Sequence, residues 1–171
     1  MISLSSDLLD KARLIKLLLT DCDGVLTDGS VYYSEIGELM KKFHIRDGMG
    51  VERLRNVAGI ETGIISGEKS ISLKRRAEKL SIDECHLGIK DKETVVRSVS
   101  MRRAIPLSSM AYIGDDVNDL RVFSLVGLSA SPRDAMSEVK KQANLVCDLK
   151  GGEGAFREFA EFLISVYLRN K

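Results

Sequence analysis

Cysteine, excess charge and long apolar runs are all scarce in this sequence, and each shortage excludes a class of protein. The three cysteines, Cys22, Cys85 and Cys147, are odd in number, widely spaced and without a CxxC pair, so neither a disulfide framework nor a zinc site is expected. Lys and Arg total 26 against 25 Asp and Glu, and the formal net charge of +1 does not favour binding to nucleic acid or to a membrane surface. No apolar run approaches the roughly 20 residues of a membrane span. Acidic and basic residues precede the first apolar stretch, which is not typical of a signal peptide, and we expect a cytoplasmic protein.

Apolar runs of strand length alternate with helix-like segments, and this alternation predicts the fold. A chain of 171 residues with 44% hydrophobic residues is expected to form one domain over residues 1–171. Strands are predicted at 14–20, 60–65, 84–87, 110–113, 128–130 and 145–147, and helices at 47–59, 70–80, 91–103, 117–125, 134–141 and from the glycine-rich segment at 151–154 to 168. The alternation implies parallel pairing with right-handed crossovers, and therefore a Rossmann-like, three-layer α/β sandwich with a central parallel sheet.

One segment, residues 29–43, departs from this alternation and is predicted to be a β-hairpin. Apolar residues at 31–33 and from 39 to 45 flank the loop Ser34-Glu35-Ile36-Gly37-Glu38, which contains glycine. The sequence shows no inserted cap domain, so any lid over a site must come from this hairpin or from another subunit.

Clusters of polar residues and glycine follow three of the predicted strands at the point where each strand ends. The pairs are Asp21 and Asp23, Ser66 and Gly67, and Asp115 and Asp116. Ligands of parallel α/β sheets bind outside the carboxyl ends of the strands. We therefore expect these side chains to form one site.

The acidic residues of this site favour a hard cation. Asp21 and Asp23 alone have two interpretations, a carboxylate pair that binds metal or attacks a phosphoryl group, and an Asx turn that closes the strand. The cluster Asp115, Asp116 and Asp119 alone is also compatible with an acidic helix start. Two such clusters favour the metal, because carboxylates brought together repel and a bound cation relieves the repulsion. Mg²⁺ is the expected cation.

Two further features suit a phosphate group. Ser66-Gly67 offers a hydroxyl and a backbone N–H, although the same dipeptide occurs in plain loops. Lys92 lies at a predicted helix start, where the helix dipole disfavours a cation, and a bound phosphate would give it a function there. The only histidines, His44 and His86, belong to no Ser-His-Asp order and no helical His pair, which disfavours serine and zinc hydrolase chemistry.

These motifs, in this order, resemble those of the haloacid dehalogenase superfamily. Residues 21–29 (DCDGVLTDG) are similar to its first motif, and residues 114–119 (GDDVND) to its fourth. Ser66 and Lys92 stand where the second and third motifs have Ser or Thr and Lys. The four motifs cover residues 14–130.

Further segments narrow the resemblance to the 3-deoxy-D-manno-octulosonate 8-phosphate phosphatases, a capless, tetrameric branch. They are residues 43–48 (FHIRDG), 127–129 (GLS), 134–135 (DA) and 151–158 (GGEGAFRE). Glu68 and Glu153 stand where that branch tends to have arginine, and His44 replaces its usual asparagine. Glu68, Lys79 and the GGEGA tail look more like the relatives that act on 2-keto-3-deoxynononate 9-phosphate, and like the phosphatase-like domain of some acylneuraminate cytidylyltransferases.

The resemblance implies a mechanism in which Asp21 attacks phosphorus and forms an aspartyl-phosphate. Asp23 would protonate the leaving sugar oxygen and then deprotonate the hydrolytic water. Mg²⁺ would be held by the carboxylates of Asp21 and Asp115 and by the backbone carbonyl of Asp23. The phosphoryl oxygens would be bound by Ser66, Gly67 and Lys92, with Asp116 and Asp119 in supporting positions.

The substrate implied by the resemblance is a sugar acid phosphate, with 2-keto-3-deoxynononate 9-phosphate expected and 3-deoxy-D-manno-octulosonate 8-phosphate as the alternative. The residues expected to contact the sugar are His44, Arg46, Asp47, Gly48, Glu68, Arg76 and Lys79. Arg46 and Arg76 suit a carboxylate, although Arg76 fits a solvated basic helix face nearly as well. Glu68 and Lys79 either pair across the pocket mouth or contact the sugar.

Two other functional classes are compatible with the same fold. One is a non-catalytic, tetramerising module that supports an acylneuraminate cytidylyltransferase, and the intact set Asp21, Asp23, Lys92 and Asp115 argues against it. The other is a phosphomutase, which is disfavoured because no cap domain is present to retain an intermediate.

The resemblance also implies a homotetramer whose active sites are completed by neighbouring subunits. An isolated two-stranded hairpin is marginal in water, so the apolar side chains of residues 29–43 are expected to contact something else. The alternative is a hairpin that folds against its own domain in a monomer.

Overall fold

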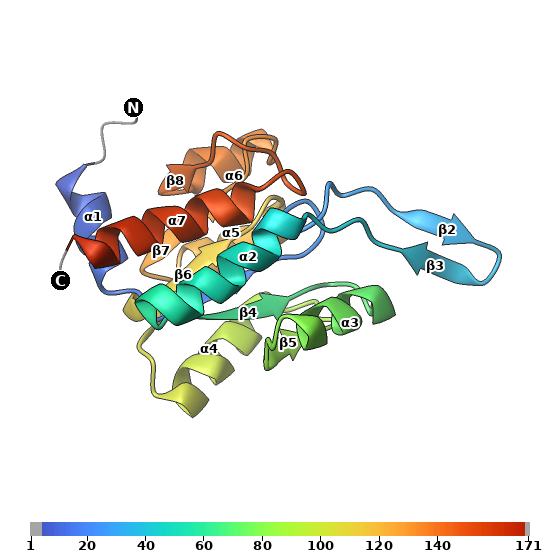
Figure 1. The fold of residues 1–171 in the computed structure, drawn as a ribbon, viewed down its shortest axis with the longest axis horizontal. Helices are drawn as coiled ribbons and strands as arrows, with labels where there is room; N and C mark the ends of the chain where they lie inside the picture. The colour runs from blue at the N-terminus through green and yellow to red at the C-terminus, as the bar shows by residue number, and fades with distance from the viewer. Residues whose placement is uncertain (1–4, 170–171) are drawn as a thin grey trace.

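The computed structural model, which describes residues 5–169, is built on one sheet of six parallel strands (Figure 1). The strand order is β5-β4-β1-β6-β7-β8, and all pairings within it are parallel. The bounds are Leu17–Thr20 for β1, Glu61–Ile65 for β4, Glu84–His86 for β5, Met110–Ile113 for β6, Leu128–Ser131 for β7 and Leu145–Val146 for β8. The chain leaves β1 towards β4 and β5 and later returns to the other side through β6, so the carboxyl end of β1 is the switch point where such sheets bind ligands.

Helices cover both faces of the sheet and make it the middle of three layers. Leu18 of β1 contacts one apolar cluster, whereas Leu17 and Leu19 contact the other, as the period of two in a strand requires. The first face is covered by α1 (Ser6–Arg13), α2 (Ile45–Arg53), α3 (Ile71–Lys79) and α7 (Ala155–Leu168), and the second by α4 (Lys92–Arg103), α5 (Leu120–Phe123) and α6 (Ser137–Gln142). The predicted three-layer α/β sandwich is confirmed.

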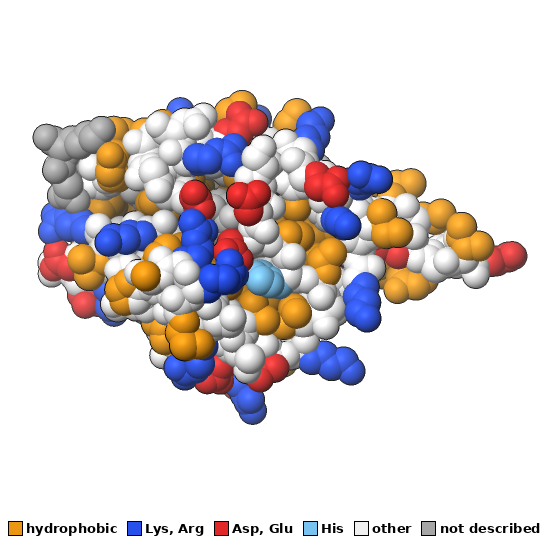
Figure 2. Space-filling view, turned by 90° about the horizontal axis from the view of Figure 1, so that it is seen from below, with side chains coloured by type: hydrophobic (Ala, Val, Ile, Leu, Met, Phe, Trp, Pro, Cys, Tyr) orange, Lys and Arg blue, Asp and Glu red, His pale blue; other side chains and the backbone are white. Residues whose placement is uncertain are grey.

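A two-stranded hairpin, β2 (Tyr32–Ser34) and β3 (Gly37–Met40), projects from one end of the molecule (Figures 1 and 2). Its apolar side chains are largely exposed, and Ile36 at the turn is 91% exposed. Only the base of the hairpin contacts its own domain, where Glu38 accepts a hydrogen bond from the hydroxyl of Ser70. The second strand is shorter than predicted, because the chain leaves the ladder after Met40 and Ile45 begins α2. At the opposite end, α1 lies beside the last turns of α7.

Helix starts are where the sequence prediction differs most from the structure. Residue His44, not Asp47, precedes α2, because the Asp47 carboxylate is buried and accepts a hydrogen bond from the backbone N–H of Arg157 at 2.9 Å. Helix α6 begins after Met136 rather than at Asp134, whose carboxylate accepts from the backbone N–H of Gly151. The helix α1, capped by the hydroxyl of Ser5, was not predicted.

The structure also describes the cysteines and the apolar character of the helices. All three cysteines are free. Within residues 5–169, no helix combines the length and apolar character needed to cross a membrane.

Candidate active site

Three carboxylates from two adjacent strand ends converge beyond the carboxyl end of β1. Asp21 directly follows β1, and Asp115 and Asp119 follow β6, which pairs with β1. One oxygen of each carboxylate lies within 4.8 Å of the others. The backbone N–H of Asp21 donates to the carbonyl of Ile113 at 2.9 Å, so the two loops are joined at their base. The structure thus brings together three of the acidic residues that were predicted to form one site.

Asp119 is buried and its oxygens are already occupied by protein donors. Its Oδ1 accepts from Lys92 Nζ and from the hydroxyl of Tyr112, both at 2.7 Å. Its Oδ2 accepts from the backbone N–H groups of Asp115 at 3.0 Å and Asp116 at 3.3 Å. Four donors leave little capacity for a cation, so Asp119 holds the loop and the lysine in place. Its supporting function stays a prediction.

Asp115 has the opposite environment, because its buried Oδ1 has no hydrogen-bond partner in the described part of the chain. Burial raises the pKa of Asp115 to about 8, and the charges of Asp21 and Asp119 contribute. Burial also raises the pKa of Asp21 to about 6, with a contribution from Asp119 that Lys92 offsets in part. An orphaned oxygen beside a second carboxylate fits a divalent cation, which would satisfy the oxygen and neutralise the charge. Gly24 keeps this space open, since a Cβ there would lie 2.0 Å from Asp115 Oδ2.

Lys92 is the first residue of α4 and is almost completely buried. Its Nζ lies 3.0 Å from Asp21 Oδ1 and 2.7 Å from Asp119 Oδ1. Burial lowers the pKa of a lysine, but here the two carboxylates outweigh burial and the pKa is raised. The preceding residue, Asp91, caps this helix, because its carboxylate accepts a hydrogen bond from the Thr94 N–H. Lys92 therefore supplies a fixed positive charge beside Asp21.

The two oxygens of Asp21 differ in their contacts. Its Oδ1 accepts from the backbone N–H of Cys22 at 2.7 Å and lies beside Lys92. Its Oδ2 receives no hydrogen bond from residues 5–169, and is left for phosphorus or a cation.

Ser66 and Gly67 follow β4 on the other side of β1. Ser66 is buried, its hydroxyl accepts from the N–H of Glu68 at 3.1 Å, and no bond among residues 5–169 uses the hydroxyl proton. Gly67 is exposed, and a Cβ there would meet nothing closer than 3.8 Å. Gly67 lines the cavity beside the acidic cluster, whereas Ser66 is not part of its lining.

These loops enclose an open cavity of about 330 Å³. The residues that line it are Asp21, Asp23, Gly67, Glu68, Asp115, Asp116, Val117 and Asn118. The lining is strongly acidic, so an anionic substrate needs a bound cation and Lys92 to offset that charge.

Comparison with known proteins identifies the family. A model of the haloacid dehalogenase-like hydrolases matches residues 58–158. The 3-deoxy-D-manno-octulosonate 8-phosphate phosphatase KdsC of Haemophilus influenzae is 40% identical over 154 residues, which cover 90% of this chain and 85% of the relative. The chain belongs to the haloacid dehalogenase-like hydrolases.

Two solved structures of such hydrolases resemble the whole fold. The cobalt-bound octulosonate 8-phosphate phosphatase of H. influenzae has a TM-score of 0.89 at 39% identity and covers 92% of this chain and 91% of its own. The enzyme of Moraxella catarrhalis, in complex with a magnesium ion, a phosphate ion and KDO, has a TM-score of 0.89 at 34% identity, covering 94% and 91%. The predicted class, a phosphoric monoester hydrolase without a cap, is confirmed. The carboxylate cluster, together with the ions in these two relatives, bears out the predicted divalent-metal cofactor.

Most residues predicted to bind the sugar do not line the acidic cavity of this haloacid dehalogenase-like hydrolase. His44, Asp47, Gly48 and Arg76 line a separate void of about 10 Å³ beneath α2. The Arg76 guanidinium lies 5.7 Å from the centre of the Phe43 ring and donates to the carbonyl of His44 at 3.3 Å. Burial raises the pKa of Asp47 to about 6, although the Arg157 N–H opposes the shift. In the single chain, these residues join α2 to α3 and α7.

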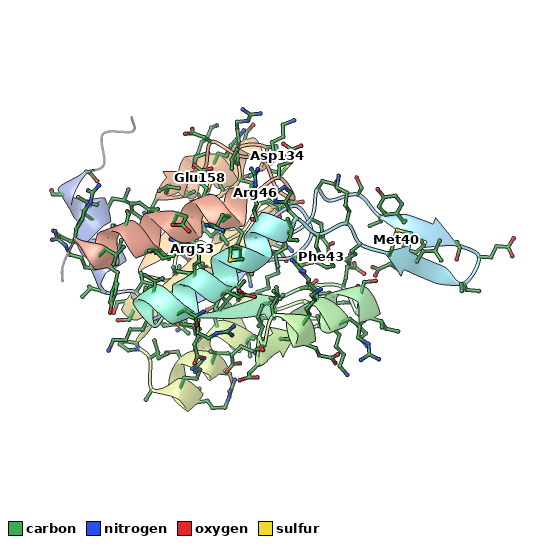
Figure 3. The ribbon with its side chains drawn as sticks, viewed as in Figure 1. Met40, Phe43, Arg46, Arg53, Asp134 and Glu158 are labelled. Atoms are coloured by element: carbon green, nitrogen blue, oxygen red, sulfur yellow. The ribbon has the colours of Figure 1, made fainter. Side chains whose placement is uncertain are left out.

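The remaining predicted specificity residues are exposed. Arg46 lies at the start of α2 (Figure 3), and Lys79 at the end of α3. Glu68 lines the acidic cavity, but no ion pair joins it to Lys79 within residues 5–169. Asp116 is exposed, and its carboxylate accepts from the N–H of Val117 at 2.7 Å, which fits a supporting function.

Two residues of the site were not predicted. Tyr112 of β6 holds Asp119, and a phenol in a fully buried strand signals a hidden hydrogen-bond partner. Lys41 pairs with Asp23 at 2.6 Å. No local pattern marks Lys41, because Lys42 beside it has the same side chain and lies in solvent.

Proposed function

We propose that this chain is a magnesium-dependent 3-deoxy-D-manno-octulosonate 8-phosphate phosphatase that works through an aspartyl-phosphate at Asp21. The observation that carries the proposal is the placement of Asp21 between the buried amine of Lys92 and the orphaned carboxylate of Asp115. The named relative, which matches 90% of the chain, supports the eight-carbon substrate. The nine-carbon substrate expected from Glu68, Lys79 and the GGEGA tail has no such support.

In the first step, Asp21 attacks phosphorus and the bond to the sugar oxygen breaks. The oxygen free for attack is Oδ2, because Oδ1 is held by Cys22 N–H and Lys92. Asp23 gives its proton to the sugar oxygen as it leaves. Lys92, the Ser66 hydroxyl and the Gly67 N–H bind the phosphoryl oxygens, so that their charge is stabilised in place.

In the second step, Asp23 takes a proton from water, which attacks phosphorus and releases Asp21 and inorganic phosphate. The residues suited to hold Mg²⁺ are Asp21 and Asp115, with the backbone carbonyl of Asp23. When bound, the ion supplies charge neutralisation between the carboxylates and the phosphoryl group. Asp119 keeps Lys92 and the Asp115 loop in position throughout.

A purely structural module does not account for this site. Burying Asp21 and Asp115 together raises the pKa of both, which means that their charged forms are costly in the metal-free fold. A scaffold has no need of such a cluster, whereas a phosphoryl-transfer site does.

A substrate comparison tests the proposed specificity. We expect kcat/KM for 3-deoxy-D-manno-octulosonate 8-phosphate to exceed that for 2-keto-3-deoxynononate 9-phosphate and N-acetylneuraminate 9-phosphate by at least about tenfold. The measurement is phosphate release with Mg²⁺ present. Faster turnover of either nine-carbon substrate would reverse the assignment.

We further propose that the hairpin assembles the chain into a homotetramer and covers a neighbour's site. The support is the projecting hairpin itself, which exposes Tyr33, Ile36, Leu39 and, as Figure 3 shows, Met40. Such a patch on a marginal two-stranded element fits contact with other copies.

A cytoplasmic location stays part of the proposal.

Replacing the hairpin's apolar side chains tests the assembly. The variant Tyr33→Ser/Ile36→Ser/Leu39→Ser is expected to sediment as a monomer and to lose most of its turnover, because the site of each subunit is then uncovered. The control is Met101→Ser, at an apolar side chain on α4 whose exposed fraction of 78% lies within the range of the three hairpin residues. An unmodified chain that sediments as a monomer, with activity unchanged by dilution, would contradict the proposal.

A further inference from the structure

The side chain of Lys41 is buried at the base of a hairpin whose apolar side chains are exposed. Only 1% of it is accessible, compared with 60% for the adjacent Lys42. A buried ammonium group is costly unless charged partners compensate it. Two partners are present, Asp23 Oδ1 at 2.6 Å and Glu38 Oε2 at 3.2 Å from Nζ.

The contact with Asp23 constrains one carboxylate oxygen and not the other. Oδ1 lies against Lys41, with the hydroxyl of Thr27 at the longer distance of 3.5 Å. Oδ2 receives no hydrogen bond from the described residues. The carboxylate is thus oriented about a fixed oxygen, with its second oxygen available to a reacting group.

The far side of Lys41 is also anchored. Glu38 accepts a hydrogen bond from the hydroxyl of Ser70, the residue that caps α3. Lys41 therefore joins the loop after β1 to strand β3, and Glu38 extends the link to the start of α3. This arrangement limits the movement of its amine.

We propose that Lys41 is a positioning residue that holds Asp23 for proton transfer. The inference rests on the proposed role of Asp23 as acid and base. Lys41 does not contact the phosphoryl group; it fixes Oδ1 of Asp23 so that Oδ2 faces the leaving oxygen and, later, the attacking water.

The test compares a poor and a good leaving group in the variant Lys41→Met, with Mg²⁺ present. For 3-deoxy-D-manno-octulosonate 8-phosphate, whose leaving group is a primary alcohol, kcat/KM is expected to fall by about 10²-fold, because proton donation contributes that much to such a step. For p-nitrophenyl phosphate, whose leaving group needs no proton, kcat/KM is expected to fall by less than about tenfold. A partly unfolded sample would lower kcat/KM for both substrates by the same factor and leave their ratio unchanged.

Three further variants separate positioning from a general structural effect. Lys42→Met removes the neighbouring lysine and its 2.6 Å pair with Asp28, and should keep both values within about twofold. In an Asp23→Asn background, Lys41→Met should add less than about threefold, because it acts through Asp23. Lys41→Arg, which keeps the charge, should recover part of the ratio.

The outcomes distinguish this inference from the proposed function. An equal loss for both substrates, or full additivity with Asp23→Asn, would overturn the role of Lys41. If Asp23→Asn alone leaves alkyl phosphate turnover intact, the proposed role of Asp23 fails, and the inference fails with it.

Discussion

Asp21→Asn is expected to lower kcat by on the order of 10⁴-fold or more, because the amide cannot attack phosphorus and no covalent intermediate forms. The fold should survive the change. The amide oxygen can still accept from the Cys22 N–H, and the substitution removes a carboxyl whose buried charge is costly, as its pKa of about 6 indicates. Stability at neutral pH should therefore be unchanged or higher.

Turnover, thermal unfolding and acid-quenched labelling together measure this result. Labelled phosphate should stay bound to the unmodified protein after quenching and be absent from the variant. Asp148→Asn, at an exposed aspartate outside the cavity, is the matched control and should behave like the unmodified chain. Turnover within about tenfold of normal in Asp21→Asn would remove Asp21 as the nucleophile.

Chelation with EDTA is expected to abolish activity, and Mg²⁺ to restore it. The site residues are oxygen donors, which suit this ion, and without it the Asp21 and Asp115 carboxylates face an incoming phosphate. Asp115→Asn should raise the Mg²⁺ concentration needed for half-maximal activity by at least about tenfold, since it removes the orphaned carboxylate. Activity that survives exhaustive chelation would contradict the metal assignment.

The same carboxylates should make the stabilisation of the fold by Mg²⁺ depend on pH. A carboxyl whose pKa is raised by folding favours the folded state at low pH, and that contribution is lost as the pH rises through the folded value. The contribution of Asp21 to the free energy of unfolding is lost between about pH 4 and about pH 6, and that of Asp115 between about pH 4 and about pH 8. Mg²⁺ relieves this cost, so the rise in Tm that it causes should be larger at pH 8 than at pH 5.5. Calorimetry with and without EDTA measures the difference.

The acidic core of the site could be predicted because strand periodicity and parallel pairing decide it. Apolar runs end at Thr20, Ile65 and Ile113, and the residues after them must meet at one edge of the sheet. Lys92, which lies beside Asp21, was also predicted as a site residue, from its position at a helix start where the dipole disfavours a cation.

Long-range contacts account for what could not be predicted. Asp47 has the spacing of a helix cap, but its carboxylate accepts a hydrogen bond from the backbone N–H of Arg157, 110 residues away. Lys41 and Lys42 are locally alike, and only the fold buries one beside Asp23. The specificity residues depended on resemblance alone, and in the single chain Arg76 contacts Phe43 and His44 rather than the cavity.

The placement of α1 beside the end of α7, opposite the hairpin, has a practical consequence for handling the protein. A tether or fusion joined near Ser6 or Leu168 emerges from the end of the molecule that is remote from β2 and β3 (Figure 1). Immobilisation through that end leaves the hairpin directed away from the support. Chains spaced far apart on such a support cannot reach one another, whereas densely coupled chains can. Specific activity as a function of coupling density would then report whether one chain works alone.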